Sequence, residues 1–312
     1  MGAKTGIEWT DATWNPIMGC SRVSEGCRHC YAEGVAARFG LKKNGAEKKP
    51  TVYDGLIHIV NGEPVWTGKI VETRQLLTPL KWRKPKRIFV NSMSDLFHEN
   101  VTDEQRDRIF AVMALCPQHT FQVLTKRPAI MHRYLSDSET SLRVQDCVDE
   151  MTDSYAYVEP FPNLWLGVSV ENQAAADERI PLLLQTPAAV RFLSCEPLLG
   201  PLLIEGALHN LPEFDDVPQL PRIDWVICGG ESGPHARPMH PDWARSLRDQ
   251  CAAAGVSFFF KQWGQWTPTA DPKIAADRGI SLKDCLSWHA KKADAGSLLD
   301  GIEHKAFPEV HA

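Results

Sequence analysis

Hydrophobic residues along this chain fall into short apolar runs, and each run ends in polar residues before a longer amphipathic stretch begins. Short runs bounded in this way are typical of buried strands, and the stretches between them have helical spacing. The runs that predict strands cover residues 88–90, 121–124, 164–168, 190–193, 225–228 and 256–260. With a first strand within residues 5–19, this alternation predicts an α/β fold, namely a partial (β/α) TIM-like barrel of about six to seven parallel strands.

The amphipathic stretches predict the helices that connect these strands. Residues 31–39 have apolar positions at helical spacing and are followed by a glycine. A second helix begins after Thr102, because Thr102 is suited to the N-cap and Gln105 stands three positions later, as in a capping box. Residues 72–80 and 243–254 also predict helices.

Two segments interrupt the pattern and predict insertions. Residues 40–66 are rich in Lys, Gly and Asn, and residues 136–162 are acidic, so we expect both at the surface. The interpretation is one barrel domain over residues 1–264, followed by a C-terminal cap or tail over residues 265–312. The basic run at residues 81–87 precedes a strand, and a solvated loop at the strand's N-terminal end is expected there.

Composition limits the partners and the compartment. The chain has 312 residues, 43% of them hydrophobic, which suffices for a full core. A formal net charge of -5 argues against a broad polyanion-binding surface, so any nucleic-acid contact must come from local basic patches. The sequence has no run of eighteen apolar residues and no apolar signal segment, and six of its nine cysteines are scattered singly. We therefore expect a soluble cytoplasmic protein in a reducing compartment, with no membrane contact.

Cys20, Cys27 and Cys30 are the strongest chemical signal in the sequence. Their spacing is C-x6-C-x2-C, and no fourth cysteine lies nearby. Thiolates hold iron–sulfur clusters, normally one for each iron, so three of them leave one iron of a [4Fe–4S] cluster open to a small chelating molecule. The alternative is a structural zinc site that adds His29 or a distant histidine as the fourth ligand.

Residues 15–32 resemble the cluster loop of radical S-adenosylmethionine (radical SAM) enzymes, in which three cysteines bind a [4Fe–4S] cluster and an aromatic residue follows the last one. Tyr31 occupies that place. The six-residue first gap departs from the commoner C-x3-C-x2-C spacing. This gap, the Trp-Asn-Pro opening and the strand-end motifs are more closely similar to a phage-associated, largely uncharacterised radical SAM subfamily related to spore photoproduct lyase. That similarity extends over about residues 6–264.

The resemblance implies a mechanism and cofactors. Cys20, Cys27 and Cys30 would hold the [4Fe–4S] cluster, and S-adenosyl-L-methionine would chelate the open iron. One electron from an external donor such as flavodoxin or ferredoxin would pass through the cluster to the sulfonium. Cleavage of the carbon–sulfur bond would yield methionine and a 5′-deoxyadenosyl radical, which abstracts hydrogen from a substrate.

Polar residues at the C-terminal ends of barrel strands point at a common cavity, which is where a barrel enzyme carries its chemistry. The resemblance implies an S-adenosylmethionine site at these strand ends, and we map its groups onto them. The ammonium is assigned to Ser92, Ser94 and Asp95, and the carboxylate to Lys126. The ribose is assigned to the acceptors Ser169, Glu171 and Asn172, and the adenine to Tyr31.

The remaining strand-end residues are the candidates for the substrate side. Four of them, Glu196, Glu231, Lys261 and Gln262, are expected to be catalytic, while Trp263 and Trp266 either stack on a base or are ordinary core or lid aromatics. Similarity to spore photoproduct lyase points to a hypermodified thymine or related nucleobase in DNA, changed by isomerase, lyase or modification chemistry. The alternatives are a radical SAM enzyme acting on a small molecule or peptide, and a zinc-binding, non-catalytic protein that binds nucleic acid or a partner.

Overall fold

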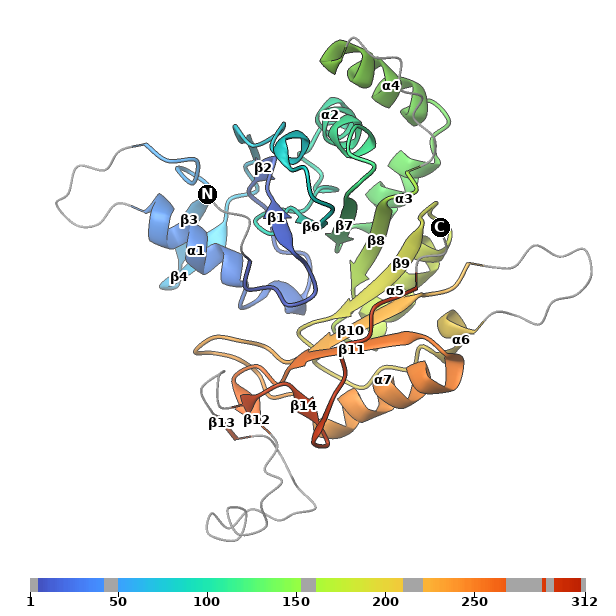
Figure 1. The fold of residues 1–312 in the computed structure, drawn as a ribbon. Coiled ribbons are helices and arrows are strands. Elements are labelled where there is room, and N and C mark those ends of the chain that lie inside the picture. The colour runs from blue at the N-terminus through green and yellow to red at the C-terminus, as the bar shows by residue number, and fades with distance from the viewer. Residues whose placement is uncertain are drawn as a thin grey trace, which may run out of the picture. The chain divides into compact units, whose positions relative to one another are not determined.

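The computed structural model describes residues 5–41, 50–152, 161–209, 221–267, 288–289 and 295–309. Its main feature is a sheet of seven strands, labelled in Figure 1. They are β1 (Ala12–Trp14), β6 (Arg87–Val90), β7 (Thr120–Thr125), β8 (Leu164–Ser169), β9 (Val190–Cys195), β10 (Trp225–Gly229) and β11 (Ser257–Gln262). Their order in the sheet is β1-β6-β7-β8-β9-β10-β11.

The pairings within this sheet are parallel for β1 with β6, β6 with β7, β7 with β8, β9 with β10, and β10 with β11. Every strand predicted from the apolar runs is present, with ends within about two residues of the expected ones. The predicted fold class is therefore confirmed: an α/β fold with a parallel sheet of the partial-barrel type.

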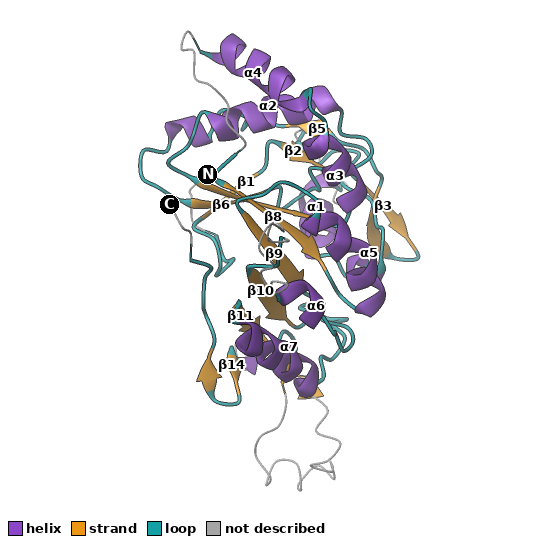
Figure 2. Cartoon of the chain, turned by 90° about the vertical axis from the view of Figure 1, so that its right-hand side faces the viewer, coloured by secondary structure: helices purple, strands orange, loops and turns teal. Residues whose placement is uncertain are grey.

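Helices follow most of the strands, as the alternating pattern predicts (Figure 2). They are α1 (Tyr31–Gly40), α2 (Asp103–Ala114), α3 (Pro128–Ser136), α4 (Thr140–Met151), α5 (Gln173–Leu184), α6 (Glu205–Leu208) and α7 (Pro241–Ala254). Two 3-10 turns are η1 (Glu25–Cys27) and η2 (Pro79–Lys81). Among the described residues, no helix has the length and apolar character needed to cross a membrane.

The chain divides into two compact units. Unit 1 comprises residues 1–168 and 185–189, and unit 2 comprises residues 169–184 and 190–312. The cysteine segment and the ends of β6 and β7 belong to unit 1, whereas the ends of β9, β10 and β11 belong to unit 2. The domain boundary expected at residue 264 stays a prediction.

In unit 1, α2 begins as the sequence predicts. The Thr102 side chain accepts a hydrogen bond from the Gln105 backbone, and the Gln105 side chain accepts one from the Thr102 backbone, which completes the capping box. Helix α4 lies beside α2 (Figure 2) and buries Val144 and Val148. The acidic stretch at residues 136–152 is thus largely a packed helix, and its carboxylates Asp146, Asp149 and Glu150 are on the exposed side.

The helix predicted over residues 72–80 is wrong. Residues Val71–Glu72 form the short strand β5, which pairs antiparallel with β2 (Ile17–Met18), and only η2 is helical. The Thr73 hydroxyl donates to the Asn15 carbonyl at 2.7 Å, and the Trp14 indole donates to the Gln75 carbonyl at 2.9 Å. These long-range hydrogen bonds hold the segment extended against the first strands, which overrides its local helical preference.

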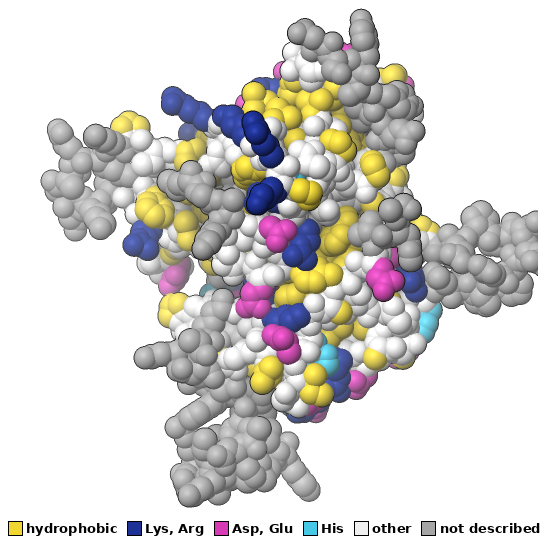
Figure 3. Space-filling view, in the orientation of Figure 1, with side chains coloured by type: hydrophobic (Ala, Val, Ile, Leu, Met, Phe, Trp, Pro, Cys, Tyr) yellow, Lys and Arg dark blue, Asp and Glu magenta, His cyan; other side chains and the backbone are white. Residues whose placement is uncertain are grey.

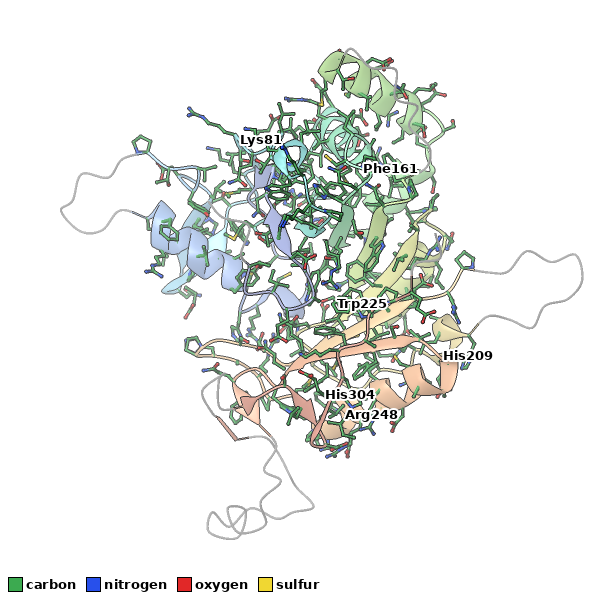
Figure 4. All side chains as sticks on the ribbon, in the orientation of Figure 1. Lys81, Phe161, His209, Trp225, Arg248 and His304 are labelled. Atoms are coloured by element: carbon green, nitrogen blue, oxygen red, sulfur yellow. The ribbon has the colours of Figure 1, made fainter. Side chains whose placement is uncertain are left out.

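Part of the expected insertion at residues 40–66 is a hairpin of β3 (Ile57–Val60) and β4 (Glu63–Trp66). Leu56, Ile57 and Trp66 are buried in a cluster that α1 also joins. The basic run that begins at the end of η2 is exposed at Lys81, Arg83 and Lys84. Figure 3 shows a group of cationic side chains in dark blue where Figure 4 labels Lys81, so a local basic patch lies at the N-terminal end of β6.

In unit 2, the C-terminal segment lies along β11. The Phe260 N–H donates to the His304 carbonyl, and the Ala306 N–H donates to the Phe258 carbonyl. The Trp225 indole donates to the Ala306 carbonyl at 2.9 Å; Figure 4 labels Trp225 and His304. This segment covers the edge of the sheet next to β11, where unpaired backbone groups would otherwise be exposed. Four short strands precede it in two antiparallel pairs: β12 (Trp266–Thr267) with β13 (Trp288–His289), and β14 (Leu298–Leu299) with β15 (Ile302–Glu303).

Candidate functional site

The three cysteines lie in the connection between β2 and α1. Cys20 follows β2 by one glycine, Cys27 is the last residue of η1, and Cys30 is the N-cap residue of α1. All three are free thiols of intermediate exposure. Removal from water raises the pKa of Cys20 to about 12, with Asp95 as the next cause, and the charges of Cys27 and Cys30 raise it further.

Gly19 brings the cysteine segment against the sheet. Its φ is 104°, in the region that favours glycine, and a Cβ at this position would overlap the Lys69 carbonyl. Its backbone N–H donates to the Met93 carbonyl at 3.1 Å, and Gly19 forms a bridge with Ser94. The loop after β6 and the cysteine segment are therefore in direct backbone contact.

Arg127 connects the cysteine segment to the loop after β6 through all five of its N–H groups. Its Nη1 donates to Asp95 at 3.1 Å and approaches the Cys20 sulfur at 3.9 Å, and its Nε donates to Glu99 at 2.7 Å. Its Nη2 donates to the Ser21 hydroxyl at 2.7 Å and to the Ser21 carbonyl at 3.2 Å. A guanidinium offers five donors in a fixed planar fork, and each of them has an acceptor here. This buried cation thereby joins the ends of β6 and β7 to the first cysteine.

The electrostatics of this cluster follow from the same contacts. Burial alone would raise the pKa of Glu99, but its own backbone N–H and the donors Arg127 and Ser21 hold that pKa at about 2. Burial would lower the pKa of Arg127, but Asp95, Cys20 and Glu99 raise it. Arg127 is therefore a permanent cation beside the Cys20 sulfur.

Sequence reasoning selected Lys126 at this strand end and missed its neighbour Arg127. The backbone N–H of Lys126 donates to Asp95 at 3.1 Å, so it supports the carboxylate through its main chain. The usable signal was the pair formed by a carboxylate after one strand and a guanidinium after the next, because adjacent parallel strands end at the same edge of a sheet.

An ion pair between the partly exposed Arg22 and the buried Glu33 fixes the other side of the cysteine segment. Arg22 donates to both oxygens of Glu33, at 2.6 and 2.9 Å, and the Trp66 backbone donates to Glu33 at 3.1 Å. Glu33 is 2% exposed although it lies on a helix. Because Arg22 stands between the first two cysteines, this pair ties the segment to α1 and β4.

The remaining unit 1 candidates for cofactor binding lie close to the cysteines and have protein partners. The Tyr31 hydroxyl donates to the Ser92 carbonyl at 2.6 Å, and the Ser92 hydroxyl donates to Asn15 at 3.1 Å. The Ser94 hydroxyl donates to the Ile17 carbonyl at 2.9 Å. Asp95 accepts from the Thr125 hydroxyl, from the backbone of Phe97 and from the two residues described above. The structure brings these five candidates, Tyr31, Ser92, Ser94, Asp95 and Lys126, to one region of unit 1.

The side chain of one polar residue in that region has no hydrogen-bond partner among the described residues. Asn91 follows β6 directly and is 4% exposed, and neither atom of its side-chain amide is hydrogen-bonded within the part of the chain that the structure describes. Its φ is 61°, in the left-handed region. Sequence reasoning passed over it, although an asparagine at a strand end is a signal for a turn in this conformation.

Ser169, Glu171 and Asn172 belong to unit 2 and are occupied in stabilising α5. Arg179 donates to the Glu171 carboxylate at 2.9 Å and to the Ser169 carbonyl at 2.8 Å. The Asn172 side chain accepts from the Ala175 backbone at 3.0 Å, as a helix N-cap does. Their expected role in ribose binding stays a prediction.

The four expected catalytic residues lie at the ends of β9, β10 and β11, and each of them has a hydrogen-bond partner there. Lys261 donates to Glu196 at 2.6 Å, and the amide of Gln262 donates to the Ser232 hydroxyl at 3.1 Å. The Gln262 side-chain oxygen is buried and has no partner among the described residues. Glu231 receives two hydrogen bonds from the Arg237 guanidinium, at 2.6 and 2.9 Å.

Trp263 and Trp266 have different surroundings. Trp263 is buried, packs edge-on against Phe260 at a ring distance of 4.9 Å, and donates to the Leu298 carbonyl. Trp266 is partly exposed and donates to the Ala236 carbonyl at 2.6 Å. In this structure Trp263 is a core residue, whereas Trp266 is only partly buried.

The residue types in unit 1 suit an iron–sulfur cluster, but the structure does not hold the three thiols grouped as metal ligands. Three thiols with no fourth in the segment match a cubane that keeps one iron open, and thiolates are the ligands that such clusters use. The guanidinium of Arg127, 3.9 Å from the Cys20 sulfur, would lie beside a cluster held by this thiolate. Within the described ranges, no three His, Cys, Asp or Glu side chains are grouped so that they could hold one metal ion.

Comparison with known proteins gives a family and no function. The model of the family described as "Protein of unknown function (DUF5131)" matches residues 4–308. No curated protein and no solved structure matches the chain. Because the family model spans nearly the whole sequence, the chain belongs to the DUF5131 family.

Proposed function

We propose that this protein is a radical SAM enzyme that acts on a nucleobase. The observation that carries the proposal is the set of three free thiols, Cys20, Cys27 and Cys30, in the connection between the first strands and the first helix of a parallel α/β sheet. Three thiolates suit a [4Fe–4S] cluster with an open iron. When bound, the cluster and S-adenosylmethionine supply reductive cleavage of the sulfonium and a 5′-deoxyadenosyl radical.

The residues around the thiols would position these groups. Arg127 holds the segment after Cys20 in place through Ser21, and the Arg22–Glu33 pair does the same ahead of Cys27. Tyr31 and the loop after β6 border the segment, and the hydrogen bond from the Tyr31 hydroxyl to the Ser92 carbonyl joins them. Their rigid support fits the need to hold a reactive cofactor at a fixed position and to limit side reactions.

The substrate side of the proposal lies in unit 2. Lys261 and Glu196 form a partly buried ion pair at strand ends, where barrel enzymes bind substrates, and Gln262 beside them has a free amide oxygen. An amide oxygen accepts from an N–H at a base edge, and the partly exposed Trp266 offers a face for stacking. On this basis we propose a modified thymine or related nucleobase in DNA, with isomerase, lyase or modification chemistry. A flavodoxin- or ferredoxin-like electron donor and a cytoplasmic location belong to the same proposal.

Anaerobic purification and reconstitution test the first half of this proposal. The expected result is a brown protein with about four irons and four sulfides per chain and an electron paramagnetic resonance signal after reduction. S-adenosylmethionine and dithionite should then yield 5′-deoxyadenosine. A colourless protein that retains one zinc ion through chelator-free purification would replace the proposal with a structural zinc site.

The substrate is tested separately. Deoxyadenosine formation is compared with phage DNA containing modified thymine, with unmodified DNA and with low-mass extracts. Stimulation by the modified DNA and a changed nucleoside in its digest would support the proposal. Stimulation only by low-mass extracts would favour a small-molecule or peptide substrate, and the cluster chemistry would stand.

A further inference from the structure

Asn91 combines two unfavourable features in one residue. Its side chain is 4% exposed, and both amide atoms lack a partner within the described part of the chain. An amide carries two donors and an acceptor oxygen, and burying them without partners destabilises a folded protein. Its φ of 61° is also one that residues other than glycine adopt rarely, although asparagine tolerates it best.

The fold does not need the Asn91 side chain for the local turn. The backbone N–H of Asn91 donates to the Trp14 carbonyl at 2.8 Å, and its carbonyl accepts from the Ser94 backbone at 3.3 Å. The main chain thus holds the left-handed turn after β6 without any contact from the amide. Glycine would make the same turn without the buried polar group and without the left-handed strain. Strain and unpaired polar groups of this kind are concentrated at ligand-binding positions.

The position of Asn91 points to the cysteine segment. The carbonyl of the next residue, Ser92, accepts a hydrogen bond from the Tyr31 hydroxyl, and the Met93 carbonyl accepts one from the Gly19 backbone N–H. Met93 belongs to the buried cluster against which Cys20 and Cys30 pack. The amide therefore stands within two residues of the groups that border the thiols.

The charged side chains named here are already paired with one another. Asp95 and Arg127 form a buried ion pair, and Glu99 shares the same guanidinium. A neutral amide can serve both ends of a zwitterion, because Nδ2 donates to a carboxylate while Oδ1 accepts from an ammonium.

We propose that Asn91 is a ligand-binding residue whose amide contacts the amino-acid end of S-adenosylmethionine. The inference rests on the proposed function for the identity of the ligand. The folded chain keeps an unsatisfied amide in the absence of the ligand, and the ligand satisfies it.

Two measurements on the variant Asn91→Gly test this proposal: the melting temperature of the apo-protein and the affinity for S-adenosylmethionine. Asn91→Gly removes the amide and suits the left-handed turn, so the melting temperature of the apo-protein should stay level or rise by about 1 to 3 °C. Affinity of the reconstituted protein for S-adenosylmethionine, measured by equilibrium dialysis, should fall at least about tenfold, the effect of losing hydrogen bonds to charged groups. Asn91→Asp, which keeps the side-chain size but cannot donate, should lower the affinity as well.

Asn61→Gly is the matched control. Asn61 also has a positive φ, 50°, but it is exposed in the turn between β3 and β4. It should change the melting temperature through the backbone effect alone and leave the affinity unchanged. 5′-Deoxyadenosine lacks the amino-acid end, so its binding should be equal in wild type and Asn91→Gly.

Three outcomes overturn the inference. One is a lowered melting temperature for Asn91→Gly with an affinity for S-adenosylmethionine within twofold of wild type. Another is an equal loss of 5′-deoxyadenosine binding, which would assign Asn91 to the nucleoside end. The third is a wild-type protein with neither cluster nor S-adenosylmethionine binding, which removes the proposed function as well; the wild type alone distinguishes this case from the first two.

Discussion

Replacing Arg127 with methionine tests whether this cation organises the cysteine segment. Methionine keeps much of the side-chain volume but removes five hydrogen bonds, among them the buried ion pair with Asp95. Loss of one partner of a buried pair costs about 3 to 5 kcal/mol, because the other charge stays buried. Asp95 keeps three donors, from Thr125, Phe97 and Lys126, and this places the expected loss at the lower limit, about 3 kcal/mol.

The assay is urea unfolding of the metal-free protein at pH 7 with reductant. Arg133→Met is the matched control, since Arg133 also pairs with an aspartate but is 62% exposed, and its loss should cost below about 1 kcal/mol. Combining Arg127→Met with Asp95→Asn should recover part of the stability, because no uncompensated charge is left. Equal losses for Arg127→Met and Arg133→Met, or a double variant that is additive, would refute the reasoning.

Three further predictions follow from other contacts. Glu33→Gln should lower the free energy of unfolding by about 2 kcal/mol in the same urea assay, because it removes the buried partner of the partly exposed Arg22, and unchanged stability would contradict this. Cys27→Ala should reduce reconstituted iron from about four per chain to below about one, whereas Cys147→Ala should not, and colorimetric iron analysis distinguishes them. The hydrogen bond from Arg245 lowers the pKa of Asp300 below its ordinary 3.8, so the stability it adds is present above that value and declines as the pH falls through the lower folded-state pKa. The difference in urea midpoint between wild type and Asp300→Asn should therefore be constant from pH 7 to about 5 and shrink at lower pH, and a difference that grows on acidification would disprove the assignment.

Residues of the candidate site differ in how well sequence reasoning placed them. Cys20, Cys27 and Cys30 were found because their spacing is a local pattern, and local patterns can be read without a fold. The capping pair Thr102 and Gln105 was found for the same reason.

Other residues depend on distant partners that no local pattern specifies. Arg127 acts through acceptors on Ser21, Asp95 and Glu99, which lie 28 to 106 positions away in the sequence. The expected helix at residues 72–80 failed because its hydrogen-bond partners belong to the first strands. The side-chain amide of Asn91 lacks a hydrogen-bond partner because of its surroundings, and the residue type alone does not predict this.

By itself, the sequence determined the alternation of strands and helices, the α/β class and the three grouped thiols, because hydrophobic periodicity and short motifs act over a few neighbouring residues. Only the tertiary structure decided which charges are buried together, which polar groups already have partners and which amide lacks one. Those properties depend on long-range packing and on exclusion of water, which arise when distant segments meet at the carboxyl ends of the strands.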